Sequence, residues 1–82
     1  MINFARIKSR VAAVEAEVKN GGDLAKMYAE NLEKINKCNP DEDDEEYETL
    51  REIEWYLIMK IVEVYMDQNG YYKDREGNYE RK

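Results

Sequence analysis

The side chains best suited to chemistry lie in one acidic run directly after the only proline. Residues 41–46 are six consecutive carboxylates, and two more follow at Glu48 and Glu52. Paired carboxylates can transfer protons to a substrate or hold a divalent cation. The run has neither the glycine nor the 12-residue loop of a calcium-binding hand, so we expect it to attract cations only loosely. We therefore predict no specific metal site and no cofactor.

Other groups that could carry catalysis are scarce in this sequence. It contains no histidine and only one serine, one threonine and one cysteine, at Ser9, Thr49 and Cys38. The absence of histidine removes the Ser-His and Cys-His pairs that activate nucleophiles, and also the commonest metal ligand. Cys38 precedes a predicted helix start, where a thiolate could be stabilised, but such a cysteine is more often a small buried side chain. We predict that the protein is not an enzyme.

The distribution of charge indicates the kind of partner. The net charge is −6, and the negative charge is concentrated in residues 21–70, which carry −9, whereas residues 1–20 carry +2 and residues 71–82 carry +1. Direct binding to nucleic acid requires a sizeable basic surface, which the chain lacks. A partner protein with a basic surface is electrostatically favoured.

Length and cysteine content indicate one small domain. A chain of 82 residues is near the lower limit for independent folding, and a single cysteine cannot form an internal disulfide. The N-terminal segment has no long apolar core after its basic residues, and the longest apolar stretch, residues 55–66, is shorter than the roughly 20 residues of a membrane span. We expect a soluble, cytoplasmic protein.

Two short helices are predicted before the acidic run, over about residues 3–19 and 24–37. The first has apolar residues at alternating spacings of three and four, and the second has an apolar stripe at helical spacing. Gly21-Gly22 ends the first helix and Asp23 caps the second, so we expect a tight antiparallel hairpin. The apolar positions are Phe4, Ile7, Val11, Val14 and Val18 in the first helix, and Leu24, Tyr28, Leu32 and Ile35 in the second.

A third, longer helix is predicted over about residues 40–68. Asn39 as N-cap, Pro40 in the first turn and Glu42 two residues later form a helix-start pattern, and Asn69-Gly70 ends the helix. Residues 1–70 would then form a three-helix domain. Residues 71–82 would form a small β-hairpin or an irregular tail. The predicted fold class is all-α, with a short helical hairpin plus one long third helix.

The third helix has two apolar stripes, and both could pack in the groove between the first two helices, but those helices are too short to cover its whole length. The first stripe contains Leu50, Ile53, Leu57, Ile61 and Val64. We predict that the second stripe is an oligomer interface, and the alternative is a monomer whose tail covers it. The predicted interface residues are Trp55, Ile58, Met59, Val62 and Met66.

The acidic run exceeds what helix capping requires. Carboxylates in the first turn stabilise a helix, but later ones form like-charge pairs four residues apart, which cost a few tenths of a kcal/mol each. Three explanations are open: a solvated face, pairing with Arg6, Lys8 and Arg10 or with the tail of a neighbouring chain, or a recognition surface. A stripe of Asp41, Glu45, Glu48 and Glu52 would repeat about every 5–6 Å, as phosphates do along a nucleic acid. The candidate partner-binding residues are Asp41, Asp43, Asp44, Glu45, Glu46, Tyr47, Glu48 and Glu52.

These observations predict a small acidic binding protein. The first hypothesis is an inhibitor or regulator that mimics nucleic acid and occupies a basic surface of a partner, as would suit a phage protein that acts on a host defence enzyme. The alternative is an oligomeric helical adaptor or assembly subunit that works through the second apolar stripe. A metal-buffering or catalytic carboxylate site is the third hypothesis.

Overall fold

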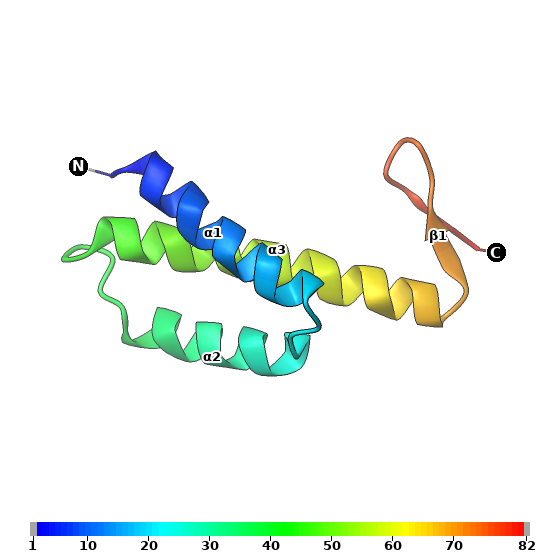
Figure 1. Ribbon diagram of the computed structural model, residues 1–82, viewed down its shortest axis with the longest axis horizontal. Helices are drawn as coiled ribbons and strands as arrows, with labels where there is room; N and C mark the ends of the chain where they lie inside the picture. The colour runs from blue at the N-terminus through cyan, green and yellow to red at the C-terminus, as the bar shows by residue number, and fades with distance from the viewer. Residues whose placement is uncertain (1, 82) are drawn as a thin grey trace.

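The computed structural model describes residues 2–81, which form three α-helices followed by a small β-hairpin (Figure 1). The predicted all-α class with a short C-terminal hairpin is confirmed. The elements are α1 (Phe4–Lys19), α2 (Leu24–Lys37), α3 (Asp44–Gln68), β1 (Tyr71–Lys73) and β2 (Tyr79–Arg81).

A polar side chain caps the start of both α1 and α2, and the cap of α2, Asp23, is the one expected from the sequence. The Asn3 side chain accepts a hydrogen bond from the Arg6 N–H at 3.2 Å, and Asp23 accepts one from the Lys26 N–H at 3.2 Å. Gly21 has a φ of 90°, the left-handed conformation that lets the chain leave α1 and turn into α2. Each helix therefore begins beside its own polar cap.

The third helix begins later than predicted, at Asp44 rather than near residue 40. Asn39 caps no helix. Its backbone carbonyl accepts from the Asp43 N–H at 2.9 Å and its side chain accepts from the Asp41 N–H at 2.9 Å, which closes a turn. Asp43 is the N-cap, and its side chain accepts from the Glu46 N–H at 3.2 Å. Asn39 and Asp43 are both residue types that cap helices, and in the structure Asp43 is the cap.

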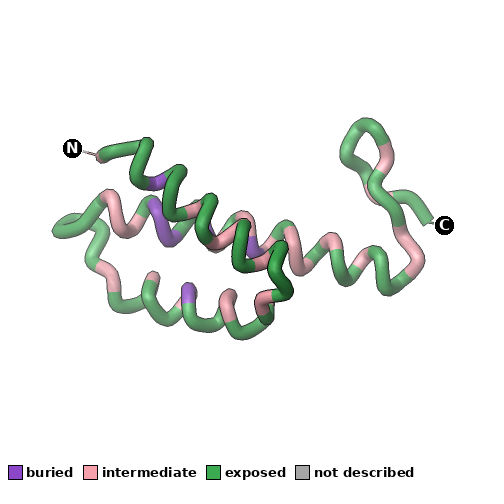
Figure 2. Tube along the Cα trace, viewed as in Figure 1, coloured by how far each residue is buried: buried purple, intermediate pink, exposed green. Residues whose placement is uncertain are grey.

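Both α1 and α2 pack against the N-terminal half of α3, and they make few direct contacts with each other. The C-terminal half of α3 continues beyond them, which gives the molecule a length of 47 Å (Figure 1). Burial is concentrated where the three helices meet (Figure 2). Among the described residues, the buried apolar side chains are Ile7, Leu50, Ile53 and Leu57.

This core is small for the length of the chain. Seven large apolar side chains are exposed among the described residues, more than the number that is buried. A domain of this size has little stability to spare unless a further interaction buries apolar surface. The exposed residues are Phe4, Trp55, Met59, Val62, Val64, Tyr65 and Tyr72.

The C-terminal hairpin is antiparallel and pairs Tyr72 with Glu80 and Lys73 with Tyr79. Its turn is held by the Asp74 side chain, which accepts from the Glu76 and Asn78 N–H groups at 2.9 Å each. β1 contacts α3, so the hairpin is attached to the protruding half of that helix. None of the helices described is both long and apolar enough to cross a membrane.

Candidate functional site

The acidic end of the molecule comprises residues 41–48, in the α2–α3 loop and the first turns of α3. Two of its carboxylates bind arginines of α1. Glu45 accepts from Arg6 Nη2 at 2.9 Å and from the Asn3 N–H at 2.8 Å. Glu46 accepts from both terminal nitrogens of Arg10, one of them at 3.2 Å. These pairs join α1 to α3.

The two ion pairs also shift the titration of their members. Arg6, followed by the Asn3 N–H, lowers the pKa of Glu45, because both stabilise the charged carboxylate. The hydrogen bond to Glu46 raises the pKa of Arg10 against a smaller opposing effect of burial. Internal pairing, one of the three explanations for the surplus charge, therefore accounts for Glu45 and Glu46. Lys8, a third expected partner, makes no ion pair with another described residue.

Two other predicted site residues have structural roles or are partly covered. Asp43 is the N-cap of α3, as described above, and Tyr47 is half-buried on the first turns of the helix. Changing Asp43 would therefore disturb the start of α3 as well as remove a charge.

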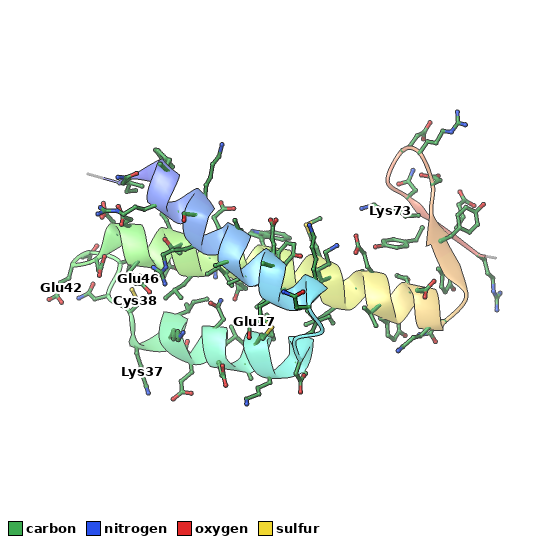
Figure 3. All side chains as sticks on the ribbon, in the orientation of Figure 1. Glu17, Lys37, Cys38, Glu42, Glu46 and Lys73 are labelled. Carbon is green, nitrogen blue, oxygen red and sulfur yellow. The ribbon has the colours of Figure 1, made fainter. Side chains whose placement is uncertain are left out.

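The remaining carboxylates are exposed. Asp41, Glu42 and Asp44 surround the start of α3, and Glu42 points outward from the loop (Figure 3). Glu48 and Glu52 lie one helical turn apart on α3. None of the five side chains makes an ion pair with a described residue.

The predicted stripe of four carboxylates is not formed as such. Asp41 lies in the loop before α3, because the helix begins three residues after it. Glu45 is occupied by Arg6. Of the predicted stripe, only Glu48 and Glu52 lie at helical spacing without an ion pair to a described residue. Two carboxylates are too few to imitate several phosphates of a nucleic-acid backbone.

Cys38 lines a shallow groove beside the acidic end together with Glu42, Asp43 and Glu46, and Figure 3 shows it next to Glu46. The thiol is half-buried and lies 3.9 Å from the Asp43 carbonyl. Burial, together with the nearby charges of Asp43 and Glu46, raises the pKa of the thiol. Cys38 therefore remains protonated near neutral pH, and the helix start does not provide the stabilised thiolate considered from the sequence.

The apolar flank of α3 comprises Trp55, Ile58, Met59, Val62 and Met66. Trp55 is 61% exposed and Met59 is 51% exposed, while Val62 is also exposed. Leu50, Ile53 and Leu57 on the same helix are buried, so the flank lies on the side of α3 that faces away from the core.

The C-terminal hairpin borders this flank without covering it. A groove of about 240 Å³ is lined by four flank residues together with Lys73, Gly77 and Tyr79 of the hairpin. The predicted alternative, a tail that covers the flank, is therefore realised only in part, since Trp55 stays mostly exposed.

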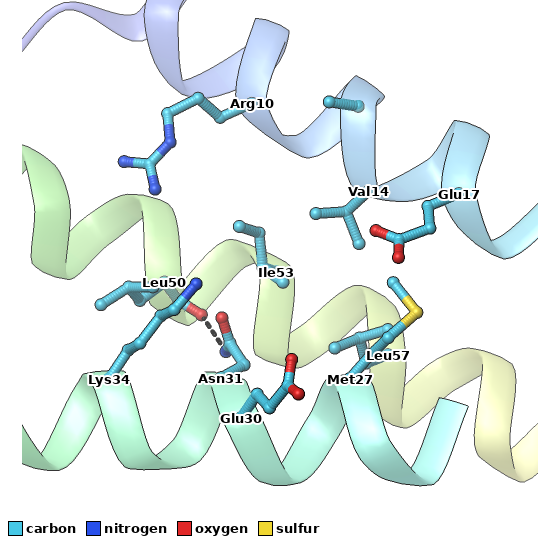
Figure 4. Close-up of a pocket in the computed structure, with 11 residues that line it drawn as sticks. Arg10, Val14, Glu17, Met27, Glu30, Asn31, Lys34, Leu50, Ile53 and Leu57 are labelled. Atoms are coloured by element: carbon cyan, nitrogen blue, oxygen red, sulfur yellow. Dashed lines mark hydrogen bonds between the residues drawn. The ribbon is translucent and has the colours of Figure 1, made fainter. Parts of the chain in front are cut away.

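A polar residue that sequence reasoning missed lies between the three helices. Asn31 is buried, and its Nδ2 donates to the Leu50 carbonyl at 2.9 Å beside a cavity of about 240 Å³ (Figure 4). It occupies a seam position, because residues 24, 28, 31 and 35 of α2 follow alternating spacings of four and three. A polar residue in such a seam was the available indication that α2 docks through a specific hydrogen bond.

Comparison of this chain with protein-family models, with curated proteins and with solved structures finds no match. Among the described residues, no group of three or more histidine, cysteine, aspartate or glutamate side chains is arranged to hold a metal ion. The features of the described residues that suggest a function are therefore the apolar flank of α3 and the exposed carboxylates of the acidic end.

Proposed function

We propose that the protein is a non-enzymatic assembly subunit whose working surface is the apolar flank of α3. The single observation that carries this proposal is the exposure of Trp55 and Met59 in a chain with so small a core. Tryptophan and methionine are enriched in protein interfaces, and contiguous apolar patches on stable monomers are commonly binding surfaces.

The partner in this proposal is the same flank of a second copy. An α3–α3 pairing would cover apolar surface on both chains at once, because an isologous interface uses one patch twice. A second helix can approach the flank because it faces away from α1 and α2, and the hairpin borders it without covering Trp55. Association would supply the burial that the single chain lacks.

Sedimentation at several protein concentrations tests this proposal. The wild-type mass should rise with concentration, and Trp55→Gln with Met59→Gln should hold the protein as a monomer that is still folded. Tyr72→Gln is the matched control, because Tyr72 is exposed but lies outside the flank, on the hairpin. A wild-type monomer at all concentrations up to about 1 mM, a weak affinity limit, would overturn the assembly proposal.

A second candidate function is inhibition of a partner with a basic surface, such as a nucleic-acid-processing or defence enzyme. The observation that favours it is the group of exposed, unpaired carboxylates at Asp41, Glu42 and Asp44. In this proposal, binding to the partner weakens steeply with added salt and is lost in a variant with Asp41→Asn, Glu42→Gln and Asp44→Asn.

The control for the second candidate is the flank variant, which should bind the basic partner as wild type does. Asp43, Glu45 and Glu46 are left unchanged in this experiment, because they support α3 and the docking of α1. Binding that is indifferent to salt but lost in the flank variant would reject the inhibitor proposal in favour of the assembly subunit.

A further inference from the structure

A groove between α1 and α3 combines an exposed apolar surface with negative charge. Its volume is about 480 Å³, and no residue of the apolar flank or of the α2–α3 loop lines it. One side is formed by α1 and the other by Glu48 and Glu52 of α3. The α1 residues that line it are Phe4, Ile7, Lys8, Val11, Ala12 and Glu15.

The apolar part of the groove is continuous along α1. Phe4 is 70% exposed at one end, Ile7 is buried at the base, and Val11 and Ala12 extend the surface by another turn. From Phe4 to Glu15, α1 rises about 16 Å at 1.5 Å per residue. That length accommodates about three turns of a helix placed alongside.

The charged part of the groove is negative on balance. Three carboxylates line it, and Lys8 is the one cation among the lining residues. The pKa of Lys60 on α3 is raised chiefly by its hydrogen bond to Glu63, and Glu15 adds only a small contribution. Glu48 and Glu52 make no ion pair with a described residue. They are one turn apart, which matches two cations four residues apart on an approaching helix.

We propose that this groove binds a basic amphipathic helical segment of a partner protein. Apolar residues of the segment pack against Phe4, Val11 and Ala12, and two lysines or arginines at a four-residue spacing pair with Glu48 and Glu52. The groove therefore requires a peptide with an apolar face, and a peptide that offers positive charge alone does not fill it. The groove shares no lining residue with the flank, although Glu52 lies one helical turn before Trp55, so the two proposals are tested with separate variants.

The test measures binding of a synthetic helical peptide of about 14 residues, with leucines on one face and lysines on both borders of that face. A peptide of the same composition in scrambled order is the control for amphipathicity. Binding is followed by calorimetry on the full chain, and amide NMR shifts locate the bound peptide. We expect saturable binding of the amphipathic peptide with a Kd below about 100 μM, and at least tenfold weaker binding of the scrambled one.

Two protein variants with equal charge loss give the decisive comparison. Glu48→Gln with Glu52→Gln removes the pair in the groove, whereas Glu76→Gln with Glu80→Gln removes two exposed carboxylates of the hairpin, outside the groove and outside the acidic end. We expect about a five- to tenfold weaker Kd for the first variant and less than a twofold change for the second, since each exposed ion pair contributes modestly. Ala12→Lys should also weaken binding, because it places a cation on the apolar surface.

Several outcomes would overturn the proposal. Equal binding of the ordered and scrambled peptides would mean that the protein responds to charge alone. Equal effects of the two charge variants, or NMR shifts confined to the flank, would place binding elsewhere. Loss of self-association in the Glu48→Gln, Glu52→Gln variant, measured by sedimentation, would mean that a second copy fills the groove.

Discussion

The contrast between Leu57 and Met59 provides a direct test of the division between core and flank. The two residues are two positions apart on α3 and point to opposite sides: Leu57 is 1% exposed and lies between the three helices, whereas Met59 is 51% exposed on the flank. We predict that Leu57→Ala strongly destabilises a single chain and that Met59→Ala does so only slightly.

The magnitudes follow from the buried surface of each side chain. Leu57→Ala removes three buried carbons at about 0.8 kcal/mol each and leaves part of a cavity, for a loss of about 3 kcal/mol. Met59 has only about half of its surface buried, so its truncation should cost about 1 kcal/mol. A domain of this length has about 4–12 kcal/mol of total stability, so Leu57→Ala removes a large part of it.

Urea unfolding followed by circular dichroism measures both losses, and protein concentration separates the single chain from the assembly. At low concentration the difference between the variants should be about 2 kcal/mol. At high concentration the deficit of Met59→Ala should grow, because the wild type gains stability from association and the variant does not. Equal losses for the two variants at low concentration would refute this reasoning, since the flank would then be covered within one chain.

Three further predictions concern single side chains. Tyr56→Phe should retain or slightly increase stability in urea unfolding, by up to about 1 kcal/mol, because the Tyr56 hydroxyl is buried without a partner among the described residues. A clear loss would show that the hydroxyl is satisfied. Because Arg6 lowers the pKa of Glu45, their pair stabilises the fold above the ordinary glutamate pKa and is lost as the pH falls through the lower folded value, below roughly pH 4. Glu45→Gln should therefore flatten the acid limb of stability against pH, and an unchanged limb would exclude this role. Asn31→Leu should cost less than about 1 kcal/mol in thermal unfolding but broaden NMR signals of α2, because the hydrogen bond to the Leu50 carbonyl specifies docking more than stability. A larger loss with sharp signals would contradict this.

Local patterns predicted the helices well where the cap and the apolar spacing agree. α1 and α2 lie within one residue of their expected bounds, because Gly21 ends the periodic residues of α1 and Asp23 precedes those of α2. Asn3, which the sequence placed inside the first helix, is its N-cap. The C-terminal stop of α3 was similarly clear from Gly70, whose φ is 81°. In each case the decisive interactions span only a few residues.

The start of α3 and the state of the acidic end depend on contacts between distant residues. Asn39 and Asp43 are both suitable caps, and only the packed structure selects Asp43. Likewise, the pairing of Glu45 and Glu46 with arginines of α1 requires that α1 lie beside the first turns of α3. Pairing with the arginines was one of three explanations of the acidic run drawn from the sequence, but the sequence alone does not show which carboxylates are paired.

The two halves of α3 should differ in how fast their amide hydrogens exchange with solvent, because only the N-terminal half packs against α1 and α2. Amide hydrogens near Leu50 and Leu57 are shielded by neighbouring helices and exchange with solvent only when the whole domain opens. Those near Tyr65 are protected only by the helix and the small hairpin and can exchange through fraying of the last turns. If a helix of a second chain packed along the protruding half, the amide hydrogens there would exchange as slowly as those near Leu50 and Leu57. Deuterium uptake would then report assembly at individual residues.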